Sequence, residues 1–230
     1  MSRSLLAAVV AACAAIMPAA AWAQENPTLA FDKPCYSAGD PVGFTGAGYS
    51  PNGEVNFFFA AGGHVGNYDT RADGTGALSG RIGTPDADHF LDDDQVSATV
   101  TVTANDRTRI DAGAPPEQQF GAAQFTLSRF GVRLRRRGGG AARAALPMRV
   151  ELVGWTHVLG EMLYLHYRRG GRTVKSVRLG RLAGDCGDRR VTLRRGLPRG
   201  ARPGRYQLVF NTSASDPHSK PRMTMTQRLR

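Results

Sequence analysis

The chain has 230 residues, and its 30 lysines and arginines outnumber 19 acidic residues to give a net charge of +11. After the first 23 residues, no apolar run approaches the roughly 20 residues that a membrane span needs, which excludes a polytopic membrane protein. The remaining segment of roughly 207 residues is therefore expected to be soluble, with room for one large or two ordinary domains.

The first segment, residues 1–23, predicts a cleavable secretory signal. One positive charge precedes an apolar run at Leu5–Met17, and small residues end at Ala21–Ala23. The alternatives are a retained membrane span and a lipoprotein signal, because Val10–Cys13 resembles a lipobox whose Cys13 would carry lipid. The chain stays apolar after Cys13, whereas a lipidated cysteine usually opens a polar tether. We expect a secreted or envelope-associated protein that contacts membrane only if Cys13 is lipidated or the signal is retained.

Strand signals fill the rest of the chain. Val, Thr, Phe and Tyr alternate in short stretches between Gly, Pro, Asn and Asp turns, and no window has a capped helical stripe. In the first half we expect strands at 28–32, 42–47, 55–60, 67–70, 77–82, 95–104 and 119–127. In the second half we expect them near 129–135, 147–153, 162–167, 174–179, 190–194, 205–211 and 223–229. Seven short strands at this spacing favour a Greek-key β-sandwich.

An internal repeat indicates two such sandwiches. The segment Gly48–Phe57 matches Gly154–Tyr164 with one inserted residue, at an offset of 106 residues, the size of one immunoglobulin-like sandwich. Each copy has a Gly-aromatic-hydroxyl turn, a Gly-Glu pair and an aromatic strand. A double glycine, at 62–63 and 170–171, then predicts a hairpin turn. The all-β chain is therefore divided into a signal peptide at 1–23 and immunoglobulin-like domains at 24–128 and 129–230, with a short linker near Ser128.

The two predicted domains have opposite charge. Residues 24–128 contain five basic and fourteen acidic residues, a net of −9, whereas residues 129–230 contain 24 basic and five acidic residues, a net of +19. Outside the cell, a positive face meets phospholipid headgroups, phosphate-bearing wall polymers, acidic polysaccharide or released nucleic acid. No recognised reading module or stacking platform accompanies the arginines, so specific nucleic-acid binding is not expected. The alternative to polyanion binding is that coding bias favours arginine over lysine and that the charges of the two halves partly neutralise each other where the halves meet.

The best candidate for an anion-contacting surface is the strand near residue 191. Four arginines flank Val191 and Leu193, so we expect the strand to bury the aliphatic side chains and to present a row of guanidinium groups. The row consists of Arg189, Arg190, Arg194 and Arg195. A second arginine run at 133–137 precedes three glycines and is interpreted as a solvated strand end.

Two cysteines, Cys35 and Cys186, remain after the signal. They lie in different repeats at non-equivalent positions, so neither has a partner within its own domain. In an oxidising compartment such cysteines more often pair than stay free, and a disulfide would close a loop of about 150 residues, a constraint of about 5 kcal/mol. Two isolated thiols or an intermolecular bond remain the alternatives. A disulfide would make the chain a rigid two-domain rod.

The sequence contains only weak candidates for metal-binding or catalytic motifs. The acidic stretch at 86–94 could hold calcium but lacks the glycine and terminal glutamate of an EF-hand loop, so a solvated turn is favoured. The histidines form no zinc-binding pair, and His166 is predicted to be packed or hydrogen-bonded on its strand. Ser50 does not lie in a nucleophile elbow, and no phosphate-binding glycine loop is present. We expect no catalytic residue, no metal site and no cofactor.

Both halves resemble a known group of proteins. The segments Cys35–Val42 and Gly46–Pro51 resemble the immunoglobulin-like repeats of secreted bacterial surface proteins. In the second half, Tyr164–Tyr167, Gly184–Gly187 and Ala201–Tyr206 are similar to the C-terminal domain of uncharacterised exported proteins from high-GC bacteria. These motifs consist of residues that form turns, so the resemblance implies a fold but says little about activity.

The sequence therefore favours a non-enzymatic, exported, monomeric protein that binds or structures something at the cell envelope, contacting anionic polymers or lipids through its basic domain. One alternative is a sandwich-fold enzyme or inhibitor, which a pocket with two carboxylates, or with a histidine and a carboxylate, would favour. Another is a small-molecule carrier, because the first repeat is similar in size and turn pattern to neocarzinostatin-type apoproteins. A carrier would need a deep apolar cleft.

Overall fold

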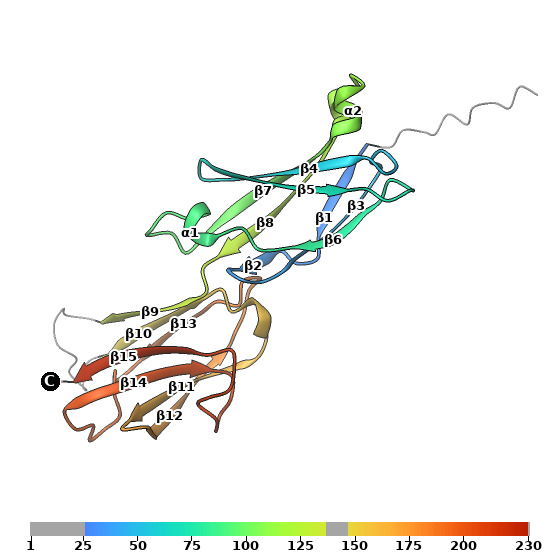
Figure 1. Cartoon of the computed structure of the whole chain (residues 1–230). Helices are drawn as coiled ribbons and strands as arrows, with labels where there is room; N and C mark the ends of the chain where they lie inside the picture. Colours follow the sequence, from blue (N-terminus) through green and yellow to red (C-terminus); the bar gives the residue numbers. More distant parts are fainter. Residues whose placement is uncertain (1–25, 137–146, 230) are drawn as a thin grey trace, which may run out of the picture.

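Two groups of strands, which share no member, lie end to end in the protein (Figure 1). The computed structural model describes residues 26–136 and 147–229. The predicted signal at 1–23, the candidate lipidation site Cys13 and Arg137 lie outside the described residues. In the described residues, helices are confined to segments of three to five residues, and the predicted all-β fold is confirmed. Within the described residues, no helix has the length and apolar character to cross a membrane.

The amino-terminal half is a sandwich of two sheets. Its strands are β1 (Thr28–Phe31), β2 (Cys35–Ser37), β3 (Val42–Ala47), β4 (Glu54–Ala61), β5 (His64–Arg71), β6 (Leu78–Ile82), β7 (Ser97–Asp106) and β8 (Phe120–Ser128). One sheet has the order β1-β3-β6, and the other has the order β2-β8-β7-β4-β5. The β2–β8 pair is parallel and the remaining pairs are antiparallel. Three short helices connect the strands: α1 (Ala87–Phe90), α2 (Arg107–Asp111) and α3 (Pro116–Gln119).

The carboxy-terminal half repeats this arrangement. Its elements are β9 (Gly131–Arg136), β10 (Met148–Val153), η1 (Thr156–Val158), β11 (Met162–Arg169), β12 (Arg172–Arg181), β13 (Arg189–Leu193), β14 (Gly204–Asn211) and β15 (Met223–Leu229). The sheets have the orders β13-β10-β9 and β12-β11-β14-β15. Without β2, the amino-terminal half pairs its seven strands in the equivalent order. This equivalence supports the sequence repeat, while the domain boundary at residue 128 stays a prediction.

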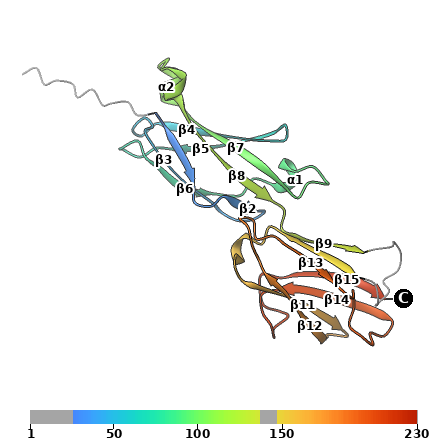
Figure 2. The ribbon, with the colours of Figure 1, turned by 180° about the vertical axis from the view of Figure 1, so that it is seen from behind.

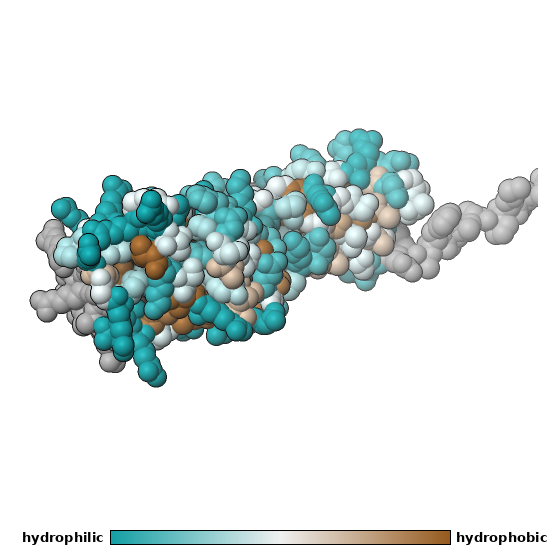
Figure 3. All heavy atoms as spheres, turned by 90° about the horizontal axis from the view of Figure 1, so that it is seen from below, coloured by the Kyte–Doolittle hydropathy of each residue, from teal (hydrophilic) through white to brown (hydrophobic). Residues whose placement is uncertain are grey.

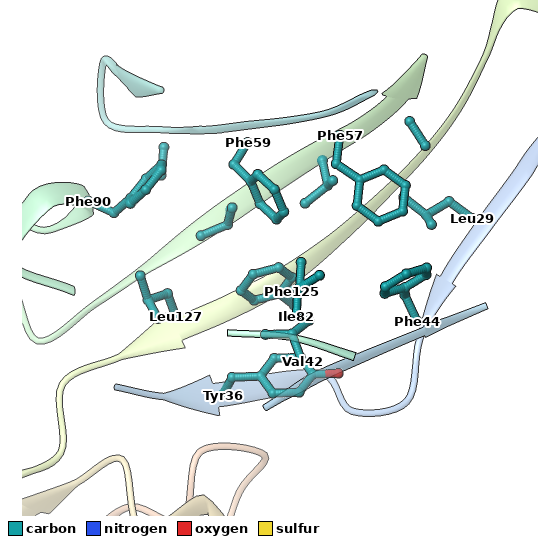
Figure 4. Close-up of a cluster of buried hydrophobic side chains, with 14 of the residues drawn as sticks. Leu29, Tyr36, Val42, Phe44, Phe57, Phe59, Ile82, Phe90, Phe125 and Leu127 are labelled. Carbon is teal, nitrogen blue, oxygen red and sulfur yellow. The ribbon is translucent and has the colours of Figure 1, made fainter. Parts of the chain in front are cut away.

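Each half has its own buried cluster, built by the period-two alternation of its strands. On β7, Val100, Val102 and Ala104 are buried. They lie in a cluster with aromatic side chains from several strands, including Phe57 and Phe125 (Figure 4). The carboxy-terminal cluster is separate and includes Trp155, Leu163, Leu165, Tyr206 and Leu208. The hydroxyl-bearing faces of the strands are thereby left for solvent.

The junction between the halves is short (Figure 2), and a disulfide bond crosses it. Only Arg129 and Phe130 separate β8 from β9. The predicted disulfide between Cys35 and Cys186 is confirmed, with 5.2 Å between the Cα atoms. A disulfide is typical of proteins from an oxidising compartment, which agrees with the expected export.

Polar side chains reinforce the junction. The Ser37 and Thr156 hydroxyls lie 2.9 Å apart, and both donate to the carboxylate of Asp40. Arg129 pairs with Asp88 and donates to backbone carbonyls of the 91–95 segment, including that of Gln95 at 3.2 Å. The basic half is therefore held to the acidic half partly by the complementary charges that the sequence indicated.

Two features differ from the sequence-based expectations. The strand β2 was not predicted, because three residues after Pro34 are too few to display an alternation. No helix was predicted between the expected strands at 95–104 and 119–127, yet this segment contains α2 and most of α3. Asp106 caps α2 by accepting a hydrogen bond from the Arg109 amide at 3.2 Å.

Candidate anion-binding surfaces

Strand direction separates the charges of the carboxy-terminal half. The loops at 154–161, 182–188 and 212–222 lie on the side of the junction, and they carry four of the five acidic residues of this half. The fifth, Glu151, lies on β10. The opposite end, which we call the basic end, has these residues: Arg168, Arg169, Arg172, Arg194, Arg195, Arg199, Arg202, Arg205 and Arg228. No described acidic residue lies at the basic end.

A first cationic surface, the arginine face, covers the outside of the sheet β13-β10-β9. Pairing places Glu151 opposite Arg190 on one side and opposite Arg133 on the other. Arg149 lies opposite Arg135. Because alternate residues of a strand point to the same face, these five side chains share one surface of the sheet.

Glu151 is the counter-ion at the centre of the arginine face. Its carboxylate is 3.0 Å from Arg149 Nε, 3.1 Å from Arg190 Nε and 3.9 Å from Arg135 Nε. Only 14% of its side chain is exposed, whereas the three arginine side chains are between 45% and 68% exposed. One negative charge is thus shared by three cations, and the arginines keep exposed donors for a second anion.

A groove of about 500 Å³ runs beside this cluster. Its lining also includes Val96 from the amino-terminal half, together with Asp188 and Arg189. Desolvation raises the pKa of Asp188, and the hydrogen bond from the Gly154 amide and the charge of Arg190 oppose this rise. The groove therefore gathers two carboxylates, Glu151 and Asp188, among five arginines.

A second cationic surface, the edge groove, lies between the edge strands β12 and β13. It has a volume of about 480 Å³. Its apolar lining consists of Tyr167, Val174, Val177, Leu193, Leu197 and Pro198, and its cations are Lys175, Arg194, Arg195 and Arg199. All four cationic side chains are exposed. The space-filling view of Figure 3 shows hydrophobic patches among hydrophilic ones over this half of the molecule.

The two surfaces differ in how their charges are compensated. Within the described part of the chain, none of the four cations of the edge groove has an acidic partner within 4.0 Å. On the arginine face, three arginines already share Glu151. An external anion would therefore compete with a carboxylate on the arginine face and with water alone in the edge groove.

The four arginines of the predicted row do not form one row. Arg190 belongs to the arginine face, whereas Arg194 and Arg195 line the edge groove. Arg189 has the opposite orientation to Arg190: its guanidinium packs against Gly180, and its Nε donates to the Leu179 carbonyl at 3.4 Å. The physical reason is that adjacent residues of a strand point to opposite faces.

Several residues of these surfaces were not singled out from the sequence. They are Arg149, Glu151, Val174, Lys175 and Arg199, whereas Arg135 was noted only within the arginine run interpreted as a solvated strand end. The alternating arginines of β9 were a detectable signal. Their convergence on Glu151 depends on the register between strands distant in the sequence, which composition and spacing do not reveal.

In the acidic stretch at 86–94 and at His166, the candidate side chains form contacts that stabilise the fold. Asp86 caps α1, and Asp88 pairs with Arg129. His166 is hydrogen-bonded as predicted: its Nδ1 lies 2.7 Å from Ser176 Oγ, and its Nε2 lies 3.0 Å from Asn211 Oδ1. Residues 26–136 and 147–229 contain no cluster of three or more histidine, cysteine or acidic side chains suited to a metal ion.

Replacing the central carboxylate, Glu151→Gln, is expected to lower the free energy of unfolding by about 1–2 kcal/mol, because three neighbouring guanidinium groups lose their shared counter-ion. The same change should increase the affinity of the protein for inorganic polyphosphate, since an internal competitor is removed. Urea denaturation and a polyphosphate titration measure the two effects. Glu161→Gln is the matched control, because Glu161 is exposed and forms no ion pair within the described residues. Equal effects of both substitutions would show that Glu151 acts only through the net charge of the protein and not as a local counter-ion.

Comparison with known proteins finds only weak similarity to solved structures. No family model matches the chain, and no curated protein matches it. Among solved structures, red sea bream transglutaminase aligns with 90% of this chain and 31% of its own length, at 12% identity and a TM-score of 0.31. A tetra-tandem repeat in the extending region of a large adhesion protein aligns with 89% of this chain and 49% of its own, at 14% identity and a TM-score of 0.31.

A third match is trypsin-activated alpha-2-macroglobulin from Escherichia coli, which aligns with 89% of this chain and 15% of its own length, at 15% identity and a TM-score of 0.30. The chain spans less than half the length of each of these three proteins. At this level of similarity the matches assign neither a family nor an activity.

Proposed function

We propose that this chain is an exported, non-enzymatic protein of tandem immunoglobulin-like domains that binds a phosphate- or carboxylate-bearing polyanion at the cell envelope. The basic end of the carboxy-terminal half is the contact surface. The observation that carries the proposal is the separation of charge described above: arginines from four strands and from the loop at 194–203 converge at one end, and the acidic residues of the same half lie elsewhere.

Arginine chemistry sets the class of ligand. A guanidinium group presents several donors in a planar fork that matches phosphate and carboxylate oxygens. A polymer with repeated anionic groups contacts several such forks at once, which a single small anion does not. The Cys35–Cys186 disulfide supports a location in an oxidising compartment, where envelope polymers and lipids are the abundant polyanions.

The enzyme alternative has one observation in its favour, because Glu151 and Asp188 line the same groove. However, the oxygens of Glu151 are engaged by three arginines. This geometry is that of a counter-ion, whereas an acid or base must reach a substrate. A carrier would need a deep apolar cleft in the first repeat, whereas the groove described in that half is lined mainly by charged residues, including Glu54, Asp69 and Arg71.

The proposal is tested with inorganic polyphosphate and the chain from Gln24 onward, which contains every described residue. We expect binding at low salt that weakens steeply as salt is added, because bound counter-ions are released. The double variant Arg194→Gln/Arg199→Gln should lose roughly ten-fold in affinity and reduce the salt slope by about two. Arg190→Gln should lose less, since Arg190 is already paired with Glu151.

The control is Arg81→Gln/Arg107→Gln, which removes the same charge from exposed positions of the amino-terminal half. Its affinity should stay close to that of the unmodified chain. Absence of binding at low salt, or an equal loss in the control, would overturn the proposal.

A further inference from the structure

We infer that the edge groove is a binding site for an anionic phospholipid at a bilayer surface. The phosphate lies among Lys175, Arg194, Arg195 and Arg199, and the glycerol and upper acyl carbons lie on the apolar floor. This inference rests on the proposed function and names its partner as a membrane, in preference to a soluble polymer.

The first argument is charge complementarity. The four cations of the edge groove line one open cavity and have no acidic partner among the described residues. Their donors are exposed to water, so a lipid phosphate does not have to displace a carboxylate. This distinguishes the edge groove from the arginine face, where Glu151 occupies the centre of the cluster.

The second argument is the apolar floor between those cations. Val177 and Leu193 are half-buried, whereas Val174 is 52% exposed. A soluble phosphate polymer has no apolar surface to place against these side chains. A phospholipid has both chemistries in one molecule, and burying its apolar part on the floor adds to the electrostatic attraction.

A local irregularity of the sheet orients the most exposed of these residues. On β12, Lys175 pairs with Tyr167 and Thr173 pairs with Arg168, so Val174 is the extra residue of a β-bulge. A bulge changes the direction of a side chain relative to the regular pleat. The bulge thus places an aliphatic side chain at the mouth of a cationic groove.

Protection of a sheet edge explains only part of this arrangement. Charged side chains on an edge strand prevent it from pairing with other chains, and this accounts for Lys175 and Arg178 on β12. It does not account for Arg194, Arg195 and Arg199, which follow β13 in a loop. It also does not explain an exposed valine beside them.

The surroundings of the groove extend the same surface. The β11–β12 hairpin carries Arg168, Arg169 and Arg172 at its end. Arg169 donates a hydrogen bond to the Pro203 carbonyl at 3.0 Å, which fixes the hairpin against the end of the 194–203 loop that lines the groove. Each basic residue near an anionic membrane surface strengthens binding roughly five-fold. The groove is therefore the apolar centre of a wider cationic end that faces the headgroups.

The test measures partitioning of the chain from Gln24 onward onto vesicles of one part phosphatidylglycerol to three parts phosphatidylcholine. Omitting residues 1–23 removes the apolar amino-terminal segment from the measurement. Pure phosphatidylcholine vesicles should not bind. The substitution Val174→Thr, which preserves side-chain shape, should weaken vesicle binding about three-fold and leave polyphosphate binding unchanged. Arg194→Gln/Arg199→Gln should weaken vesicle binding roughly 20-fold.

The matched control for Val174→Thr is Val65→Thr. Val65 is 50% exposed, lies on β5 of the amino-terminal half and belongs to no cationic groove. Its substitution should leave both kinds of binding unchanged. If the Val174→Thr variant and the unmodified chain bind vesicles equally, the apolar floor does not contribute to binding, and the lipid assignment is overturned.

A second measurement reports contact with acyl chains directly. A Val174→Trp variant should lose fluorescence on vesicles whose acyl chains are brominated, whereas Val65→Trp should not, and the native Trp155 is fully buried. Binding to polyphosphate without binding to vesicles would overturn the lipid inference and leave the proposed function standing. Absence of both would overturn both.

Discussion

Replacing Cys35 and Cys186 by serine is expected to lower the free energy of unfolding of the whole chain by about 5 kcal/mol. The disulfide joins residues 151 positions apart, so its loss releases one of the longest loops that the chain can form in its unfolded state. Loop-closure entropy increases with the logarithm of loop length, which is why a bond of such wide span has a large effect. Cys35 is buried, so the bond belongs to the packed interior of the junction.

Urea denaturation of the double serine variant measures this loss, and the unmodified chain in reducing agent should show the same shift. Small-angle scattering should also detect a larger radius of gyration, since the short linker and non-covalent contacts, such as those of Arg129, Asp40 and Arg133, then hold the halves together. A shift below about 1 kcal/mol would show that the bond does not constrain the unfolded chain as the loop-entropy model requires.

The second large effect is expected at Asp106, where Asp106→Ala should lower the free energy of unfolding by about 3–5 kcal/mol. The side chain is fully buried and accepts a hydrogen bond from the Ser50 amide at 2.6 Å. It also lies 3.5 Å from Nε of Arg109, which is itself largely buried. Removal of the carboxylate takes away an ion pair of the largely buried guanidinium, the acceptor for the Ser50 amide and the cap of α2.

Thermal and urea denaturation measure this effect, and Asp111→Ala is the control. Asp111 lies on the same helix but is exposed, so its substitution should change stability by less than about 0.5 kcal/mol. Asp106→Asn should retain part of the stability, because an amide oxygen can still accept from Ser50. A loss for Asp106→Ala no larger than that for Asp111→Ala would contradict the assigned role.

The sequence was informative where a local pattern determines structure. Residues 97–104 alternate between apolar and hydroxyl side chains, which is sufficient to predict β7 and its buried face. The Gly-aromatic-hydroxyl turns predicted the repeat because glycine at such positions has few substitutes. Gly154, for example, has a φ of 69°, and a side chain there would collide with the Arg129 backbone. The disulfide followed from the absence of other partners for the two cysteines.

The sites depended on contacts between distant strands, and the sequence was less informative there. The arginine at position 190 and the glutamate at position 151 are paired only through the register of β10 and β13. The predicted arginine row ignored the alternation that turns Arg189 inward. The exposure of Val174 results from a bulge, and single insertions of this kind leave no signature in hydrophobic periodicity.

The cross-link at the junction also determines how the molecule would transmit force. If the loop at 194–203 of the basic end is held on a surface and residue 26 is pulled, tension passes from residue 26 to Cys35, crosses the sulfur bridge to Cys186 and continues to the held loop. The chain between the two cysteines, which are 151 positions apart, is bypassed. Fully extended, that stretch corresponds to roughly 500 Å of chain that stays unloaded until the bridge is reduced. Under such a load, only the segments before Cys35 and after Cys186 can be extended while the bond is intact.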